Sequence, residues 1–156
     1  MVLDSQEVHE EQTIIFYLGD ELYGLPITAI QEIIRLKRIT PVPGADSYIE
    51  GVTNLRGRII PVLDLRRRLE LETREPTPET RIIVIEVEGQ QAGLIVDAVK
   101  EVAYFSPDSV SPPSTLASEG EFLQGVAREP DRLVGLLNLK SLLPTDDKLP
   151  KELREA

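Results

Sequence analysis

The sequence predicts a mainly β protein made of two similar small β-barrels with a few short helices. The helical period is nearly absent, and short apolar runs bounded by Gly, Pro and Asp recur instead. The chain also repeats itself once: residues 14–33 can be laid over residues 83–102, and residues 51–69 over residues 125–143, without gaps. Both matches occur in the same order, which indicates two units of roughly 70 residues with a shared plan.

The repeat matches glycines and carboxylates as well as apolar residues. In the first match the paired residues are Gly24 with Gly93, Leu25 with Leu94, Ala29 with Ala98 and Glu32 with Glu101; in the second, Gly51 pairs with Gly125 and Val52 with Val126. The alternative is that apolar strands resemble one another by chance, but two matches at offsets of 69 and 74 residues make chance the weaker interpretation. The expected pseudo-repeats span about 12–69 and 81–143.

Short runs rich in Ile, Val and Tyr predict ten strands. In chain order these are 12–18, 22–25, 31–36, 51–55, 58–64, 81–88, 91–96, 99–105, 124–128 and 132–138. Residues 18–21 and 87–90 stand at matching places and are typical of hairpin turns, in which glycine supplies a positive φ. Residues 55–58 predict another turn.

Helix signals are brief. Single turns are expected at Ile27–Ile30 and Val96–Val99, with Thr28 and Asp97 as candidate N-caps. Further short helices are expected at 65–69 after Asp64, at 139–143 after Asn138, and near 46–50.

The folded domain is expected over residues 12–145, between charged tails at 1–11 and 146–156. An acidic linker rich in proline, 70–80, joins the repeats, and 106–121 is expected to be the longest loop. One barrel of about 70 residues buries only a modest core, so the two should pack together, and the seam between them makes a groove.

Charge and composition narrow the classes of function. A net charge of −10 disfavours nucleic-acid binding. The polar, acidic N-terminus and the lack of an apolar run of 18 residues disfavour a signal peptide and a membrane span. With no cysteine, we expect a cytoplasmic protein. Residues 35–68 nevertheless carry a net charge of +5, which indicates either a face that meets an acidic partner or a solvated surface.

Signals for catalysis are weak. The single histidine, His9, lies in the polar N-terminal tail, and the phosphate-binding glycine motifs are missing from the sequence. The acidic pairs lack calcium-loop spacing, so no metal or cofactor is expected. We expect a protein without enzymatic activity; the alternative is a small β-barrel enzyme or ligand-binding protein that uses acidic residues near Arg56.

The segment 51–58 is the most specialised part of the sequence. It contains Asn54, Leu55, Arg56 and Gly57, where the second repeat has a generic polar turn at 127–131. One interpretation is that Asn54 and Gly57 supply turn geometry while Arg56 pairs with a neighbouring carboxylate. The other is that the planar guanidinium of Arg56 donates hydrogen bonds to a partner protein.

The stretch GVTNLRGRIIPVLDLRRRL, with FYLGDELYGLPITAIQEII before it and GLIVDAVKEV after it, resembles the CheW family of chemotaxis coupling proteins. The resemblance covers about Gln12 to Leu143. It implies two intertwined five-stranded SH3-like barrels and a cytoplasmic scaffold without enzymatic activity. It further implies that the scaffold joins the histidine kinase CheA, through its CheW-like regulatory domain, to the membrane-distal tips of chemoreceptors.

The resemblance also implies partner-binding residues. Asn54, Leu55, Arg56 and Gly57 match the family motif and would lie at or beside the receptor-contact groove; Ile30, Glu32 and Ile33, with Val99 and Val102, would line the seam or the faces used for kinase and receptor. For Ile30, Ile33 and Val102, burial in the core is the alternative. With no receiver or kinase domain in the sequence given, a stand-alone adaptor that is monomeric when isolated is expected.

Overall fold

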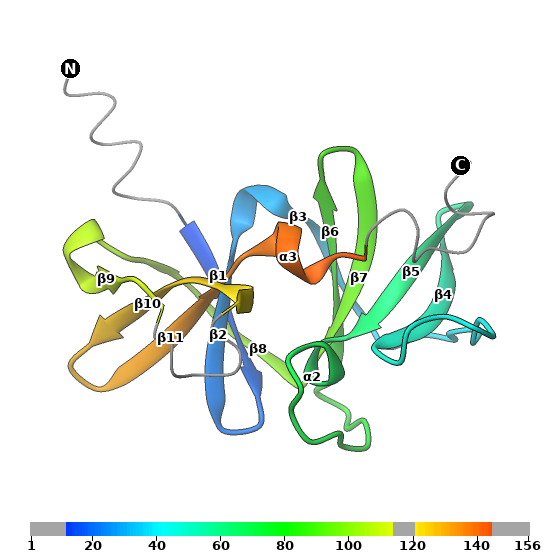
Figure 1. The fold of residues 1–156 in the computed structure, drawn as a ribbon, viewed down its shortest axis with the longest axis horizontal. Helices are drawn as coiled ribbons and strands as arrows, with labels where there is room; N and C mark the ends of the chain where they lie inside the picture. The colour runs from blue at the N-terminus through cyan, green and yellow to red at the C-terminus, as the bar shows by residue number, and fades with distance from the viewer. Residues whose placement is uncertain (1–11, 114–120, 145–156) are drawn as a thin grey trace.

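The computed structural model describes residues 12–113 and 121–144, which form two β-sheets. The expected tails, 1–11 and 146–156, lie outside the described residues. One sheet has six strands in the order β8 (Ala98–Tyr104), β1 (Gln12–Leu18), β2 (Glu21–Pro26), β11 (Arg132–Leu137), β10 (Leu123–Glu129), β9 (Val110–Ser111). The other has five, in the order β3 (Ile30–Arg35), β6 (Arg81–Val87), β7 (Gln90–Val96), β5 (Arg58–Asp64), β4 (Ile49–Leu55) (Figure 1).

The two repeats exchange strands. The six-stranded sheet combines the β1–β2 hairpin of the first repeat with β8, β10 and β11 of the second, and the five-stranded sheet combines the β6–β7 hairpin with β3, β4 and β5. Replacing each strand by its repeat equivalent converts one order into the other, apart from the extra β9. The predicted fold class of two intertwined β subdomains is therefore confirmed, with a short sixth strand added to one sheet.

Glycines stand where the exchanged hairpins join their new sheets. Strands β2 and β11 pair in parallel with Gly24 opposite Leu136, and β7 and β5 pair in parallel with Gly93 opposite Val62. A Cβ on Gly24 would lie 2.6 Å from Cγ2 of Thr13, and one on Gly93 would lie 2.7 Å from Cγ2 of Ile82. Both positions need glycine because the neighbouring strand occupies the space of a side chain.

The short helices follow the predictions only in part. A 3₁₀ turn, η1, spans Ile27–Ala29, but its N-cap is Pro26 and not Thr28. Helix α2 spans Leu65–Arg68, and Asp64 caps it by accepting a hydrogen bond from the Arg66 amide at 3.0 Å, as predicted. Helix α3 spans Leu139–Leu142, and the Asn138 side chain makes no capping hydrogen bond.

Three predictions of local structure were wrong. Asp97 is a single bend between β7 and β8 and does not start a helical turn, because its carboxylate is used in contacts distant in sequence. The expected short helix near 46–50 is instead a turn, closed by a hydrogen bond from the Ile49 amide to the Asp46 carbonyl, and β4 begins at Ile49. The loop expected at 106–121 contains the 3₁₀ turn η2 (Pro107–Ser109) and strand β9, which pairs with β10, and its residues 114–120 lie outside the described residues.

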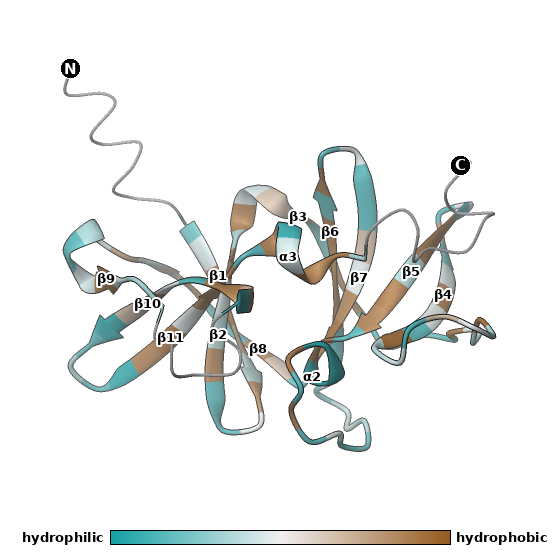
Figure 2. Cartoon of the chain, in the orientation of Figure 1, coloured by the Kyte–Doolittle hydropathy of each residue, from teal (hydrophilic) through white to brown (hydrophobic). Residues whose placement is uncertain are grey.

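One hydrophobic core joins the two sheets. It contains Phe16 and Leu25 from the six-stranded sheet together with Leu63, Ile83 and Leu94 from the five-stranded sheet, all fully buried. Each sheet also covers a smaller cluster of its own. Figure 2 shows hydrophobic residues along the middle of the strands and hydrophilic residues at the hairpin ends. Within the described residues, no helix has the length and apolar character needed to cross a membrane.

Candidate functional site

The specialised segment forms the tight turn between β4 and β5. Arg56 has φ +54° and Gly57 has φ +87°, so both adopt the left-handed conformation that suits a two-residue hairpin turn. The Asn54 side-chain oxygen accepts a hydrogen bond from the Gly57 amide at 3.0 Å. Asn54 and Gly57 therefore supply turn geometry, whereas Arg56 occupies a backbone conformation that arginine rarely adopts.

The guanidinium of Arg56 has a partner within the chain. Its Nε and Nη2 donate to the two carboxylate oxygens of Glu32 at 3.0 and 2.8 Å, and the arginine side chain remains 74% exposed. The hydrogen bond from Arg56 lowers the pKa of Glu32 below its ordinary value. The structure thus shows the pairing of Arg56 with a nearby carboxylate, and it leaves this pair displayed on the surface.

The pair also closes the five-stranded sheet. Glu32 lies on β3 and the Arg56 turn follows β4, and these strands are the opposite edges of the sheet. The β3–β4 connection adds further links to β4. Thr40 pairs with Val52, the Thr53 hydroxyl donates to the Arg38 carbonyl at 2.7 Å, and Lys37 Nζ donates to the Asn54 carbonyl at 2.7 Å.

The second repeat holds an equivalent ion pair. Glu101, the counterpart of Glu32, accepts from Arg132 at 2.6 Å, and Arg132 also donates to Glu129 at 2.6 Å. Arg132 corresponds to Arg58 and not to Arg56, so the two repeats reach the same carboxylate from different positions. The match of Glu32 with Glu101 in the repeat was the sequence signal for this arrangement.

The apolar candidates divide into surface and core. Ile33 on β3 and Val102 on β8 occupy equivalent places on edge strands and are 37% and 45% exposed. Ile30 and Val99 are half-buried against the shared core. Leu55 is buried and packs with Ile60, Val62, Ile82 and Val84, so its side chain belongs to the core and is not available to a partner.

The predicted basic face is smaller than the sequence indicated, because the arginines of α2 are used internally. Arg68 donates to the carbonyls of Leu142 and Ser141 at 2.8 and 2.9 Å, and its guanidinium stacks over the Tyr48 and Phe122 rings. Arg67 pairs with Glu50 and Asp64. Exposed basic residues remain at Arg35, Lys37, Arg38, Arg56 and Arg58.

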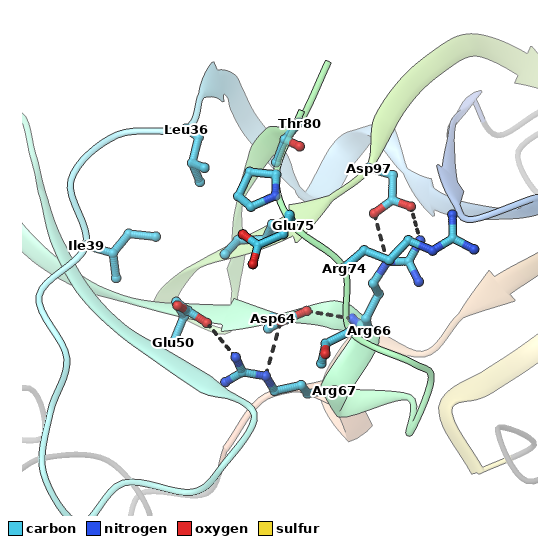
Figure 3. A pocket seen from close by; sticks show the side chains of 13 residues that line it. Leu36, Ile39, Glu50, Asp64, Arg66, Arg67, Arg74, Glu75, Thr80 and Asp97 are labelled. Atoms are coloured by element: carbon cyan, nitrogen blue, oxygen red, sulfur yellow. Dashed lines mark hydrogen bonds and ion pairs between the residues drawn. The ribbon is translucent and has the colours of Figure 1, made fainter. Parts of the chain in front are cut away.

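A second polar cluster, which sequence reasoning missed, lies beside a cavity of about 440 Å³ (Figure 3). The buried Arg66 donates from Nε to Asp97 at 3.0 Å, pairs through Nη2 with the other oxygen of the same carboxylate, and donates from Nη1 to the Glu72 carbonyl at 2.8 Å. Asp97 also accepts from the Gly19 amide at 2.6 Å. These bonds tie the β1–β2 turn of one sheet to α2 beside the other.

Opposing effects act on Asp97. Burial raises the pKa of its carboxyl. The hydrogen bonds from Arg66 and from the Gly19 amide lower the pKa by more than burial raises it, so the pKa lies below the ordinary value. The carboxylate is therefore held charged beside a buried arginine. Across residues 12–113 and 121–144, no group of three or more acidic or histidine side chains is arranged to hold a metal ion.

Comparison with known proteins points to one family. The profile of the CheW-like domain matches residues 12–147. Among curated relatives, the chemotaxis protein CheW of Rhizobium meliloti (strain 1021) is 35% identical over 139 residues, which cover 88% of this chain and 90% of that protein. Protein FrzA of Myxococcus xanthus is 33% identical, covering 92% of this chain and 91% of its own length.

A solved structure is similar to this chain in both fold and sequence. The crystal structure of the scaffolding protein TtCheW from Thermoanaerobacter tengcongensis matches with a TM-score of 0.83 and 36% identity. The match covers 92% of this chain and 94% of that protein.

Proposed function

The chain belongs to the CheW-like domain family, and from this premise we propose that it is a non-enzymatic scaffold that couples chemoreceptor cytoplasmic tips to the histidine kinase CheA. Its relatives carry the names of chemotaxis proteins, and its structural neighbour is described as a scaffolding protein. These similarities support a chemotaxis scaffold protein.

One observation carries the proposal: the duplication produces two equivalent surface patches on one shared core. Each surface combines an edge strand, an exposed β-branched residue and a carboxylate–arginine pair. The surface on β3 has Ile33 and Glu32–Arg56, and the surface on β8 has Val102 and Glu101–Arg132. An adaptor must hold two partners at once, and a rigid body with two surfaces meets that need.

Arg56 is the recognition residue that we assign to the first surface. Its exposed guanidinium is held in one orientation by two hydrogen bonds, and Gly57 beside it carries no side chain. A fixed planar donor loses less entropy on binding a carboxylate or carbonyl than a mobile side chain does. Ile33 supplies apolar area on the neighbouring edge strand, while Ile30 and Val99 support the surfaces from beneath.

The proposed setting is the cytoplasm, where the chain would join membrane receptor arrays only through its partners. We expect it to contact the CheW-like regulatory domain of CheA and the receptor hairpin tip, and to be a monomer in isolation. The contact with a helical tip would follow helix-in-groove recognition, in which apolar side chains are spaced along one face.

The test is a titration of the protein against a purified receptor cytoplasmic hairpin and, separately, against the kinase regulatory domain. Binding to both with no small molecule present, and kinase activation when all three are combined, is the expected result. Binding to neither partner would contradict the scaffold function, and turnover of a small molecule would support the enzyme alternative instead.

A further inference from the structure

We propose that the six-stranded sheet carries a separate docking groove for a partner segment with an apolar centre and Lys or Arg flanks. This acidic groove has a volume of about 580 Å³. It lies between the β1–β2 and β10–β11 hairpins, whose turns are seen at the lower left of Figure 1. Its lining includes the apolar residues Leu123, Val126 and Leu133, which we call the floor, and the exposed acidic residues Asp20, Glu21 and Asp131, which we call the rim.

The floor offers apolar contact area to a partner. Leu133, the second residue of β11 after the turn of the β10–β11 hairpin, is 58% exposed and lines the groove. Val126 and Leu123 are half-buried around it. A hollow whose apolar lining includes an exposed leucine is the kind of surface that is covered in a complex.

The rim determines the charge of that partner. Within the described residues, none of the carboxylates of Asp20, Glu21 and Asp131 takes part in an ion pair. The one basic residue of the lining, Arg132, is already paired with Glu101 and Glu129. The groove therefore presents unbalanced negative charge around an apolar floor, which favours a cationic partner.

The other repeat shows that the fold does not require these acidic residues. The counterparts of Asp20, Glu21 and Asp131 are Gly89, Gln90 and Gly57, all uncharged. The apolar residues are kept, because Val52 and Ile59 stand where the groove has Val126 and Leu133. In the five-stranded sheet these two residues line a different hollow, which is bordered by Lys37 and Arg38 of the β3–β4 connection and not by the β6–β7 hairpin. Charge at this place differs while the strands remain the same, as expected for partner selection.

The acidic groove includes no residue of the Arg56 surface and shares Arg132 alone with the surface on β8, so the proposal goes beyond the coupling function. A suitable occupant is an amphipathic helix or extended segment that places one or two apolar side chains on the floor and basic side chains on the rim. Such a segment would bind with an affinity that falls as salt rises, because the rim carboxylates are exposed to solvent.

The probe is a synthetic amphipathic helical peptide of about 18 residues with a leucine face and lysine flanks, compared with a peptide in which glutamate replaces every lysine. Each is titrated by calorimetry into the full chain at low and high salt. The lysine peptide should bind and the glutamate peptide should not. Leu133→Ser should weaken binding roughly tenfold, whereas Ile59→Ser, the equivalent change on the other sheet, should not.

A charge-matched pair of variants separates the groove from general attraction to an acidic protein. Asp20→Asn/Glu21→Gln/Asp131→Asn should weaken binding roughly tenfold or more. Glu70→Gln/Asp108→Asn/Glu121→Gln changes the net charge of −10 by the same amount at exposed positions elsewhere and should leave binding unchanged. Circular dichroism checks that each variant is folded.

Three results would overturn the proposal. The first is equal weakening by the two charge-matched variants, and the second is equal weakening by Leu133→Ser and Ile59→Ser. The third is self-association in sedimentation of the protein alone that both Leu133→Ser and Lys37→Glu abolish, which would assign the groove to a second copy. Kinase activation by Arg56→Ala is a separate readout, so failure here is distinguishable from failure of the coupling function.

Discussion

At the scale of single residues, a backbone outlier and an ion pair coincide at Arg56. A non-glycine residue at positive φ is unfavourable, and such outliers gather at functional turns. Glycine at this position would relieve the backbone but remove the guanidinium held by Glu32. Arginine at this position therefore retains the paired guanidinium at the cost of a strained backbone, which agrees with a role in recognition.

Arg56→Ala should keep the fold and lose coupling, because the side chain is exposed and its turn is otherwise held by Asn54 and Gly57. Arg56→Lys should rescue poorly, since an ammonium cannot donate two parallel hydrogen bonds. The measurements are kinase activation in a receptor–adaptor–kinase reconstitution and the melting temperature. Arg58→Ala, an exposed neighbour, is the control. Full activation by Arg56→Ala would remove Arg56 from the recognition surface.

Ile33 and Ile30 should respond differently to the same substitution. Ile33→Asp should leave the melting temperature nearly unchanged and reduce receptor or kinase binding, because Ile33 lies on the exposed side of β3. Ile30→Asp should destabilise by about 2 kcal/mol or more, because it puts a carboxylate against the shared core. Circular dichroism and a pull-down with each partner distinguish the two. An unfolded Ile33→Asp variant would show that Ile33 supports the core.

At the scale of elements, the junctions between exchanged strands hold the two sheets together. The two parallel pairings, β2 with β11 and β7 with β5, join strands from different repeats. A glycine stands at each junction, where a Cβ would lie 2.6 or 2.7 Å from a side-chain methyl group of the same hairpin. The Arg66–Asp97–Gly19 cluster adds a polar link where β7 leads into β8.

Gly24→Ala should destabilise the protein by about 1–3 kcal/mol through overpacking against Cγ2 of Thr13. Thr13→Ser removes that methyl group, so the double variant should recover part of the loss. Urea denaturation of all four proteins in the cycle measures the coupling. Strictly additive effects would show that the close contact is not the cause.

Stability in acid should depend on Asp97. Its pKa is lower in the folded protein than its ordinary value of 3.8 in an unfolded chain. Its contribution is therefore complete above the ordinary value and is lost as the pH falls toward the folded value. Asp97→Asn should destabilise at pH 7 by about 2 kcal/mol, because it leaves buried Arg66 without its counter-charge.

The same substitution should also flatten the loss of stability in acid, which chemical denaturation between neutral pH and pH 3 measures. Asn still accepts a hydrogen bond from the Gly19 amide, so the turn contact is retained and the charge alone changes. A variant whose acid sensitivity equals that of the wild type would assign the effect to other carboxylates.

At the scale of the whole molecule, the repeats are not the folding units. The six-stranded sheet needs strands from both repeats, and the shared core takes side chains from both sheets. Separating the repeats would leave β1–β2 and β6–β7 as isolated hairpins without the strands that flank them. Isolated hairpins are at best marginally stable in water.

A fragment of residues 1–79 should therefore be unfolded, and so should residues 80–156. Mixing the two should restore β structure and a cooperative melt, because each supplies the hairpin that the other lacks. Circular dichroism and thermal denaturation of the fragments, alone and mixed, provide the measurement. A sharp two-state melt of residues 1–79 alone would show that the first repeat folds without the exchange.

The sequence by itself determined the strands, the hairpin turns and the duplication. Alternating apolar residues and glycines at turns are properties of neighbouring residues, so the sequence shows them directly. The match of Glu32 with Glu101 follows from the constant spacing between the repeats. It also pointed to the turn at Asn54–Gly57, because the second repeat lacks that motif. The short strand β9 and the bend at Asp97 escaped prediction, because contacts distant in sequence decide both.

Only the tertiary structure decided which strands share a sheet and which charges meet. The sequence pattern of a hairpin fits either sheet equally well. Which sheet the hairpin joins depends on how the whole chain packs, and no local pattern predicts that. The partner of Arg56 is 24 residues away and that of Arg66 is 31 residues away, each on a different strand or turn. Distance in space decides whether a charge is solvated, paired or available to a partner, and the fold alone sets that distance.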